Sequence, residues 1–440
     1  MEEADFLISA RWIIPVEPHG VVLENHALAV RGGRILALED ADHAAQRFAG
    51  ATRLDRPNHV LLPGLVNAHT HAAMTLFRGL ADDLPLGDWL GQHIWPAEAR
   101  WAGPEFVRDG TELAVLEMLR GGTTCFNDMY FFPDQAAQAA ITQGIRAAVG
   151  MILIEQPTRW ASHIDEYFDK GLAVHDQFRS HPLLSTSFAP HAPYTVSDEP
   201  LQRVRKLADE LDVPVHMHVH ETAHEVATAV SEQSRRPMAR LEELGLVNSA
   251  LAAVHMTQLT DAEIEGLAAA GSSVVHCPES NLKLASGFCP VARLLAAGVN
   301  VALGTDGAAS NNDLDLLGEM RTAALLAKAV ADDAAAVAAP DALAMATLNG
   351  ARALGLADEI GSLLPGKAAD LICLDLQQPA TTPVYNPLSQ VVYAAGRDQI
   401  SDVWVAGESL LADGQFTRAE ATQVMERASA WRDRLVSGHD

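Results

Sequence analysis

The sequence predicts an α/β protein: a (β/α)8 TIM-like barrel that carries a small β-sandwich domain built from both chain termini. Apolar β-type runs alternate with helical stretches over residues 59–365. Short β-type runs separated by turn signals occupy residues 1–58 and 366–440. Polar residues gather where the central runs end, and barrels of this kind place their active sites at the carboxyl ends of their strands.

The two chain ends are expected to pair into one small β domain. We expect N-terminal strands at residues 6–8, 27–30 and 35–38, with no helix closing over them. We expect C-terminal strands at residues 369–375, 392–394, 402–405 and 408–411. A final helix should follow, with Thr417 and Glu420 as a capping box. Its apolar face should contain Val424, Ala428, Trp431 and Leu435.

The central part of the chain contains eight apolar runs, as a closed barrel requires. These runs end near His69, Asn127, Met151, Ala189, His218, His255, His276 and Thr305. The predicted connecting helices include residues 103–120, 199–211, 261–270 and 313–329. This alternation is typical of parallel strands joined by crossover helices.

Composition narrows the class of partner. The net charge of -26 argues against nucleic acid and anionic membranes, because binding phosphates needs clustered Lys and Arg. The four cysteines form no C-x-x-C pair, which indicates a reducing cytoplasm. The acidic N-terminus and the interruption of its apolar run by Arg11 argue against a signal peptide. We therefore expect a cytoplasmic protein with a small-molecule substrate and no membrane span.

The stretch HVLLPGLVNAHTH, residues 59–71, presents His69 and His71 with one residue between them. In an extended strand, residues i and i+2 face the same way, so the two imidazoles converge on one point. An isolated H-x-H is more often a buried polar pair or a chance repeat than a metal site. The interpretation of this pair therefore depends on residues further along the chain.

The fifth run ends VPVHMHVHET and places His216, His218 and His220 on one face. Spacing alone does not choose a metal ligand among them. His218 is the best candidate because a carboxylate, Glu221, follows it three residues on. The alternative for Glu221 is an acid that stabilises a helix start beside the cap candidate Thr222.

The sixth run ends at His255, and the eighth ends VALGTDGAASNN, which contains Asp306. Each alone is explained as well by a satisfied strand-end histidine or by an Asp-Gly turn. Together with the earlier histidines they supply the N and O ligands of a zinc or iron(II) site with a position left for water. His255 and Glu221 remain free for other roles. The sequence predicts these metal ligands: His69, His71, His218 and Asp306.

This order of residues resembles the amidohydrolase superfamily, whose members carry H-x-H after the first barrel strand, His after the fifth and sixth, and Asp after the eighth. The resemblance includes the GKAADLICLD segment at residues 366–375. Binuclear members usually carry a carboxylated lysine after the fourth strand. Here that strand ends SFAPHAPYT, and Lys170 and Lys206 lie in helical stretches. The resemblance therefore implies one divalent metal per subunit, zinc or alternatively iron(II).

Five motifs resemble the 5'-methylthioadenosine/S-adenosylhomocysteine deaminases: NAHTHAAMTLFRGLADDLPLGDWL, HIWPAE, APHAPYT, HCPESNLKLASG and GTDGAASNN. The resemblance implies that Glu98 binds the ribose hydroxyls, that His191 contacts the nucleoside, and that the subunits form a homodimer or larger homo-oligomer. The alternatives are a solvated acid for Glu98 and a loop histidine held by its backbone for His191. His220 departs from the smaller residue expected beside the catalytic Glu. Arg159 stays outside the predicted site because no motif surrounds it.

The implied reaction is hydrolytic deamination of the adenine ring to the inosine analogue and ammonia. A divalent metal makes hydroxide available at neutral pH by lowering the pKa of water, and the hydroxide attacks C6. We expect Glu221 to protonate ring N1. We expect Asp306 to pass the water proton to the departing ammonia, and His255 to orient the hydroxide.

Three other functions stay open. A hydrolase of chloro- or amino-s-triazines, or another nucleobase deaminase of the superfamily, would use the same metal ligands. A non-catalytic scaffold built on a degenerate barrel is the alternative from another class. The segment His276-Cys277-Pro278-Glu279 lacks the second cysteine of the P-C-x-x-C zinc deaminases, so we expect it to form a substrate-side loop.

Overall fold

The computed structural model describes residues 2–438 and contains the predicted barrel. Its eight strands are hydrogen-bonded in chain order, and each neighbouring pair is parallel. The barrel strands are β5 (Leu65–Thr70), β6 (Thr123–Asp128), β7 (Arg146–Leu153), β8 (Leu184–Pro190), β9 (Val215–Val219), β10 (Leu251–His255), β11 (Ser273–His276) and β12 (Asn300–Leu303).

Side chains and a backbone hydrogen bond join β12 to β5, so that the first and last strands meet. Asn67 Nδ2 donates to Thr305 Oγ1 at 2.8 Å, and its Oδ1 accepts the Thr305 N–H at 3.1 Å. The Asp306 N–H donates to the His69 carbonyl at 3.1 Å. This seam therefore brings the ends of the first and last strands together.

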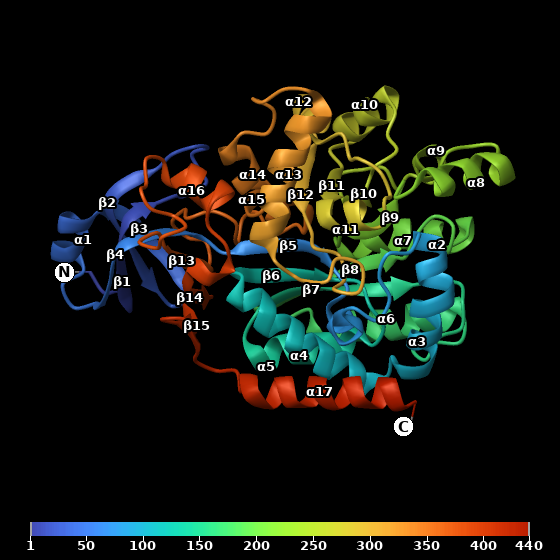
Figure 1. Cartoon of the computed structure of the whole chain (residues 1–440), viewed down its shortest axis with the longest axis horizontal. Coiled ribbons are helices and arrows are strands. Elements are labelled where there is room, and N and C mark those ends of the chain that lie inside the picture. Colours follow the sequence, from blue (N-terminus) through green and yellow to red (C-terminus); the bar gives the residue numbers. More distant parts are fainter. Residues whose placement is uncertain (1, 439–440) are drawn as a thin grey trace.

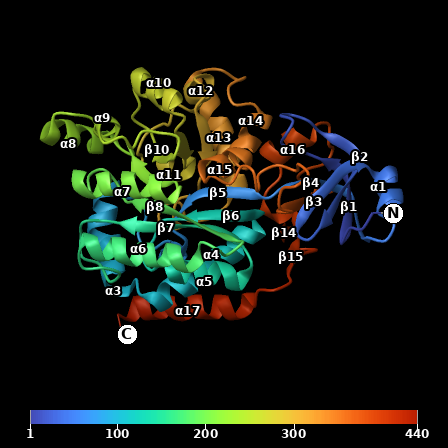
Figure 2. The same cartoon turned by 180° about the vertical axis from the view of Figure 1, so that it is seen from behind.

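Helices surround the barrel, as Figures 1 and 2 show from opposite sides. The larger connecting helices are α4 (Pro104–Arg120), α5 (Pro133–Gln143), α6 (Ile164–Phe178), α7 (Asp198–Leu211), α8 (Ala223–Gln233), α10 (Asp261–Ala270) and α13 (Leu316–Ala331). The shorter ones are α9 (Pro237–Glu243), α11 (Pro278–Lys283), α12 (Val291–Ala296), α14 (Ala339–Met345) and α15 (Leu348–Ala353). Sequence signals define many ends; α10, for example, begins after a capping box formed by Thr260 and Glu263.

The segment after β5 folds over the carboxyl end of the barrel. It contains the 3-10 helix η1 (Ala72–Phe77), α2 (Leu86–Asp88), the π-helix η2 (Trp89–Ile94) and α3 (Trp95–Trp101). Its buried side chains Phe77, Trp89 and Ile94 belong to a second hydrophobic cluster that also includes Phe106 of α4. This packing places α3 beside the barrel mouth.

Strands from both chain ends form one further sheet, with the order β16-β15-β14-β13-β4-β1-β2-β3. Its N-terminal strands are β1 (Phe6–Ile13), β2 (Leu23–Arg31), β3 (Arg34–Asp40) and β4 (Thr52–Pro63). Its C-terminal strands are β13 (Leu371–Asp375), β14 (Ile400–Val405), β15 (Glu408–Ala412) and β16 (Gln415–Phe416). The two ends meet where β4 pairs antiparallel with β13. Strand β4 continues past residue 58, to Pro63.

Two local predictions for the strands at the chain ends are wrong. Helix α1 (Ala41–Arg47) does cover the N-terminal strands, and Asp40 caps it by accepting the N–H groups of Asp42 and His43. Residues 392–394 are not a strand, because α16 (Pro387–Tyr393) includes most of them. The remaining short element there is the 3-10 helix η3 (Arg397–Gln399).

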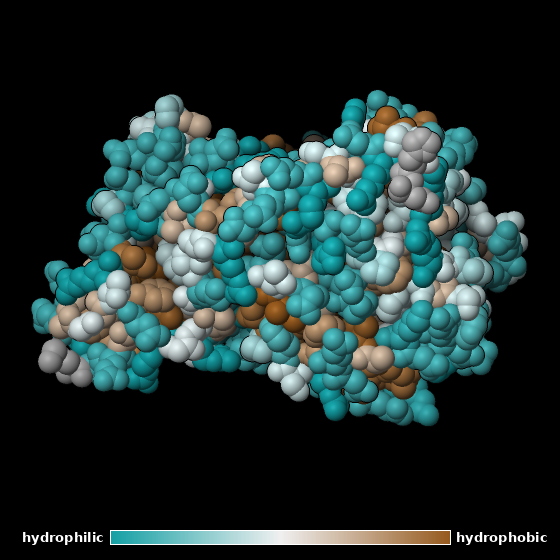
Figure 3. Space-filling model, turned by 90° about the horizontal axis from the view of Figure 1, so that it is seen from below, coloured by the Kyte–Doolittle hydropathy of each residue, from teal (hydrophilic) through white to brown (hydrophobic). Residues whose placement is uncertain are grey.

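The C-terminal helix α17 (Ala421–Ser437) lies along the barrel beside α4, in red at the bottom of Figure 1. It begins after Glu420 without a side-chain cap, so the predicted capping box is absent; Thr417 Oγ1 instead donates to the Ser409 carbonyl. Val424 and Trp431 of the predicted apolar face are buried. Figure 3 shows a mostly hydrophilic surface from this side, with apolar residues in small groups. Within the described residues, no helix has the length and hydropathy to cross a membrane.

Candidate active site

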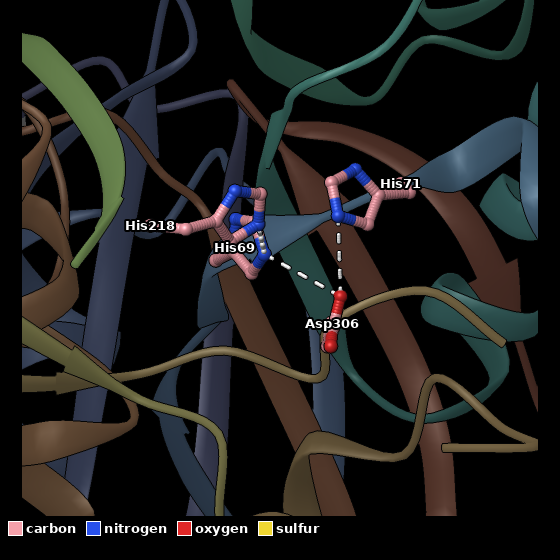
Figure 4. Close-up of side chains that lie close together, drawn as sticks. All are labelled: His69, His71, His218 and Asp306. Atoms are coloured by element: carbon pink, nitrogen blue, oxygen red, sulfur yellow. Dashed lines mark hydrogen bonds and ion pairs between the residues drawn. The ribbon is translucent and has the colours of Figure 1, made fainter. Parts of the chain in front are cut away.

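The four predicted metal ligands lie together at the carboxyl end of the barrel. His69 and His71 come from the end of β5, His218 from β9, and Asp306 from the turn after β12. One ligand atom of each lies within 4.8 Å of those of the others. Asp306 Oδ1 is 3.4 Å from His69 Nε2 and 3.3 Å from His71 Nε2 (Figure 4). His218 Nε2 is 3.2 Å from His69 Nε2.

The Nδ1 atom of each ligand imidazole, which points away from the cluster, contacts another group of the protein. His71 Nδ1 is 2.6 Å from the Met129 carbonyl, and His218 Nδ1 is 2.8 Å from the His191 carbonyl. A carbonyl only accepts, so both Nδ1 atoms donate to these carbonyls, and both Nε2 atoms face the ligand cluster. His69 Nδ1 is 2.8 Å from His216 Nε2, which fixes its ring in the same way.

Asp306 is oriented by its neighbours. Its Oδ2 accepts the hydroxyls of Ser280 at 2.6 Å and Ser310 at 2.9 Å, and its Oδ1 accepts the Gly307 N–H at 2.7 Å. Its backbone is left-handed, with a φ of 61°. Burial alone would raise the pKa of Asp306, but the hydrogen bonds with His69 and His71 outweigh burial and hold the pKa well below its usual range.

The donor set fits a divalent metal ion. Burial lowers the pKa of His69 to about 4 and the pKa of His218 well below its usual range, so both imidazoles are neutral, as metal ligation requires. Burial also lowers the pKa of His71, but the Asp306 carboxylate outweighs burial and raises that pKa to about 9, so a metal ion would displace a proton from His71. Three imidazole nitrogens and one carboxylate oxygen match the ligands that zinc and iron(II) accept, and leave a coordination position open.

The three histidines of the fifth run have different places. His218 joins the cluster, whereas His216 lies behind it against His69. His220 leaves the strand with a φ of 52°, and its Nε2 accepts the Met238 N–H at 3.3 Å. The site cavity is lined by His218 and Glu221 but not by His220. The departure at His220 from the smaller residue expected there therefore leaves the cavity wall unchanged, because its side chain turns away.

Glu221 and His255 face each other beside the ligand cluster. His255 Nδ1 donates to Asn281 Oδ1 at 2.9 Å, which directs Nε2 toward the cavity. His255 Nε2 is 3.9 Å from Glu221 Oε2. Burial raises the pKa of Glu221. A carboxyl with a raised pKa is suited to donate a proton near neutral pH.

A cavity of about 220 Å³ opens onto these groups. Both predicted substrate-binding residues, Glu98 on α3 and His191 after β8, line it. Burial raises the pKa of Glu98 to about 7, although the neighbouring Tyr130 hydroxyl lowers it in part. Burial lowers the pKa of His191 to about 3, so this imidazole is neutral. Apolar side chains provide much of the remaining wall: Met74, Leu86, Trp89, Leu90, Trp95, Ile152, Ile154 and Leu284.

The segment after β11 is helical rather than a loop, because Pro278 starts α11. Its Ser280 and Asn281 hold Asp306 and His255, and Leu284 lines the cavity. These residues belong to the HCPESNLKLASG motif, but nothing in that motif indicates what they contact. Glu279 faces away and accepts the Thr322 hydroxyl at 2.8 Å.

Sequence reasoning missed Tyr130, and its exclusion of Arg159 from the site is wrong, because both residues line the cavity. Tyr130 follows β6 and lies beside Glu98. Arg159 comes from the loop after β7, and its guanidinium donates to the Arg100 carbonyl. Neither residue belongs to a motif, so the sequence could indicate a place in the site only by their position after a barrel strand.

A barrel with these ligands at its carboxyl end is typical of hydrolases that use a divalent metal. The chain belongs to the amidohydrolase family, because the model of that family matches residues 60–410. It is 49% identical over 431 residues to a 5-methylthioadenosine/S-adenosylhomocysteine deaminase of Teredinibacter turnerae, with 98% of each chain covered.

Solved structures agree with this family. A crystal structure described as an adenosine deaminase from Xanthomonas campestris with bound zinc has a TM-score of 0.98 and 58% identity, and the match covers 99% of both chains. Atrazine chlorohydrolase from Arthrobacter aurescens, complexed with zinc, has a TM-score of 0.90 at 24% identity, with 97% of this chain and 100% of that chain covered. The latter likeness concerns the fold alone.

Proposed function

We propose that this protein is a metal-dependent deaminase of adenine nucleosides. Its substrates are 5'-methylthioadenosine, S-adenosylhomocysteine or both, with adenosine as a further substrate, and the products are the inosine analogue and ammonia. The observation that carries the proposal is the buried Glu98 in the same cavity as the ligand cluster and Glu221. The names of the similar deaminases support the same substrates.

We propose that His69, His71, His218 and Asp306 hold one divalent ion per subunit, zinc or alternatively iron(II). The oriented imidazoles, of which those of His69 and His218 are neutral, and the zinc in the similar structure support this assignment. When bound there, a divalent ion would supply hydroxide at neutral pH, because it lowers the pKa of water to about 7.

The roles of the surrounding side chains depend on the chemistry of the ring. Attack at C6 places negative charge on N1, and Glu221 donates the proton that N1 requires. Asp306 takes one proton from the attacking water and passes it to the leaving ammonia, and the second proton of that water returns to Glu221 as the C6 carbonyl forms. His255, held through Asn281, directs its Nε2 at the attacking oxygen and stabilises its charge.

We assign the orientation of the substrate to other residues of the cavity wall, Glu98 and His191. Glu98 accepts the two ribose hydroxyls as a carboxylate, and its position beside Tyr130 supports that role. The neutral His191 ring, 5.0 Å from the His218 ring by centroids, contacts the nucleoside. Apolar wall residues such as Trp89 and Leu90 exclude water from the reacting ring.

A panel of substrates tests the proposal. The purified, zinc-loaded protein is incubated with 5'-methylthioadenosine, S-adenosylhomocysteine, adenosine, guanine and a chlorotriazine, and ammonia and chloride are measured. We expect ammonia from the adenine nucleosides. Turnover of the chlorotriazine alone would overturn the assignment, and turnover of guanine alone would make the protein another kind of nucleobase deaminase.

The scaffold alternative predicts no turnover and no tightly held metal. Elemental analysis separates the two, since we expect one transition metal per chain. A cytoplasmic location, for which the four free and buried cysteines are suited, is part of the same proposal. We also propose that the subunits form a homodimer or larger homo-oligomer. Analytical ultracentrifugation measures this oligomeric state.

A further inference from the structure

The turn between β9 and α8 carries Glu221 and has an unfavourable backbone. His220 has a φ of 52°, a left-handed conformation that residues with side chains seldom adopt. This conformation interrupts the strand alternation, so that Glu221 faces the cavity while His220 turns away. Such a conformation persists only where the surroundings hold it.

Glu225, on the first turn of α8, holds the N–H side of this turn. Its Oε1 accepts the His220 N–H at 3.0 Å, and its Oε2 accepts the Glu221 N–H at 2.7 Å. The Thr222 hydroxyl caps the helix by accepting the Glu225 N–H at 3.1 Å. In an ordinary capping box the acid bonds the N-cap amide. Here the Glu225 carboxylate instead bonds the amides of Glu221 and His220, one and two residues before the N-cap.

Thr257, which follows β10, holds the carbonyl side of the same turn. Its hydroxyl donates to the Glu221 carbonyl at 2.7 Å, and its N–H donates to the His220 carbonyl at 3.0 Å. The N–H groups are thus fixed from α8 and the carbonyl groups from β10. Glu225 does not line the cavity at the ligand cluster; it lines the adjoining cavity, which Glu221 also lines.

We propose that Glu225 is a positioning residue: its carboxylate clamps the His220 and Glu221 amides and thereby fixes the direction of the Glu221 side chain. This inference rests on the proposed role of Glu221. A carboxylate offers two acceptors in one plane, whereas a glutamine amide offers one acceptor and one donor. Glu225→Gln therefore retains the size of the side chain but loses one of the two amide bonds.

Hydrogen exchange tests the clamp without reference to any substrate. In Glu225→Gln, the amides of residues 220 and 221 should exchange faster than in the parent protein. Glu232→Gln is the matched control, because Glu232 is exposed on the same helix and the substitution is chemically identical. Exchange that is unchanged in Glu225→Gln, or equally faster in the control, would overturn the clamp.

Steady-state kinetics with 5'-methylthioadenosine then test what the clamp does. Burial raises the pKa of Glu225 to about 7, so the assay is run at about pH 8, where the carboxylate is charged. We expect Glu225→Gln to lower kcat about 10- to 100-fold, with little change in KM and full metal content. Parent-like kcat would contradict the proposal.

Two further variants separate positioning from other effects. In a Glu221→Gln background, Glu225→Gln should cause no further loss of kcat, because it acts through Glu221. An equal additional loss of kcat would show a different cause.

Glu225→Asp keeps the charge, but its side chain is too short to reach both amides, so its kcat should resemble that of Glu225→Gln. Full activity of Glu225→Asp would assign the effect to charge instead. If the parent protein deaminates no adenine nucleoside, the proposed function fails, and hydrogen exchange still decides on the clamp.

Discussion

Among single residues, we expect Glu98 to make substrate binding depend on pH. Its pKa is raised to about 7 by burial, so the carboxyl is charged above this pH and neutral below it. Only the charged form accepts two ribose hydroxyls, so KM for 5'-methylthioadenosine should rise as the pH falls from about 8 to about 6. Steady-state assays across this range measure the effect. Glu98→Gln should give a high KM that no longer changes with pH, whereas a constant KM in the parent protein would contradict the role.

We expect the reaction itself to depend on a proton that Glu221 donates. Glu221→Gln keeps the size of the side chain and touches no ligand of the metal, so the variant should bind a full complement of metal. It cannot donate a proton to N1, and kcat should fall about 10²- to 10⁴-fold. Rapid-quench or steady-state assays with elemental analysis measure both quantities. A kcat near that of the parent protein would remove Glu221 from the acid role.

The sequence could predict which side chains meet because parallel strands bring their carboxyl ends to one edge. His69, His71, His218 and Asp306 each stand at such an end and do come together. The supporting contacts, such as Ser280 with Asp306, depend on how a helix after one strand packs on the next, which strand spacing does not encode. The turn at His220 likewise depends on tertiary hydrogen bonds.

Among the elements, α17 stabilises the part of the structure that carries Glu98. Trp431 Nε1 donates to Asp109 Oδ2 of α4 at 2.9 Å. The Trp431 ring packs edge-on against Phe106 of α4 at 5.3 Å and Trp101 of α3 at 6.5 Å, by centroids. Trp101 lies one turn after Glu98 on α3. The helix at the chain end is therefore part of the packing behind the cavity.

Removal of the Trp431 side chain should lower the free energy of unfolding. Trp431→Ala leaves a cavity and an unpaired polar atom, and we expect a loss of about 3–5 kcal/mol in the free energy of unfolding, measured with urea. Met425→Ala is the control, since Met425 is 53% exposed on the same helix and should change stability by less than about 0.5 kcal/mol. A similar small effect for both variants would show that α17 is not anchored through Trp431.

Element prediction succeeded where periodicity is long and failed where one short signal decided. The eight barrel runs alternate with helices over the whole centre of the chain, and all eight form strands. Val392 and Tyr393 suggested a strand over residues 392–394, but Asn386 accepts the Ser389 N–H at 3.2 Å and Pro387 starts a helix there. The cap outweighs the β propensity of two residues.

For the whole molecule, a buried ion pair joins the barrel to the terminal sheet. Arg146 at the start of β7 donates to both carboxylate oxygens of Asp370, just before β13, at 2.9 and 3.1 Å. Asp370 Oδ1 also accepts the Ala406 N–H at 2.7 Å. The two side chains are 7% and 2% exposed. We propose that the two sheets are two domains, residues 59–365 and residues 1–58 with 366–440, joined by contacts of this kind.

Asp370→Asn should weaken the junction between the sheets. The substitution leaves the Arg146 charge buried without its counter-charge, which costs about 3–5 kcal/mol. Asp176→Asn removes one partner of the exposed pair Asp176–Arg179, whose side chains are 70% and 62% exposed, and should cost less than about 1 kcal/mol. Urea unfolding of both variants measures the difference, and equal stability would contradict a structural role for Asp370.

A metal titration of activity decides whether the four ligands at the barrel mouth hold a catalytic ion. The protein is stripped with a chelator, zinc is added in known equivalents, and ammonia release from 5'-methylthioadenosine is recorded. Ammonia release should be absent without metal and should rise linearly to a maximum at one equivalent of zinc per chain. Full activity of the stripped protein, or no ammonia at any zinc level, would contradict a metal-dependent deaminase.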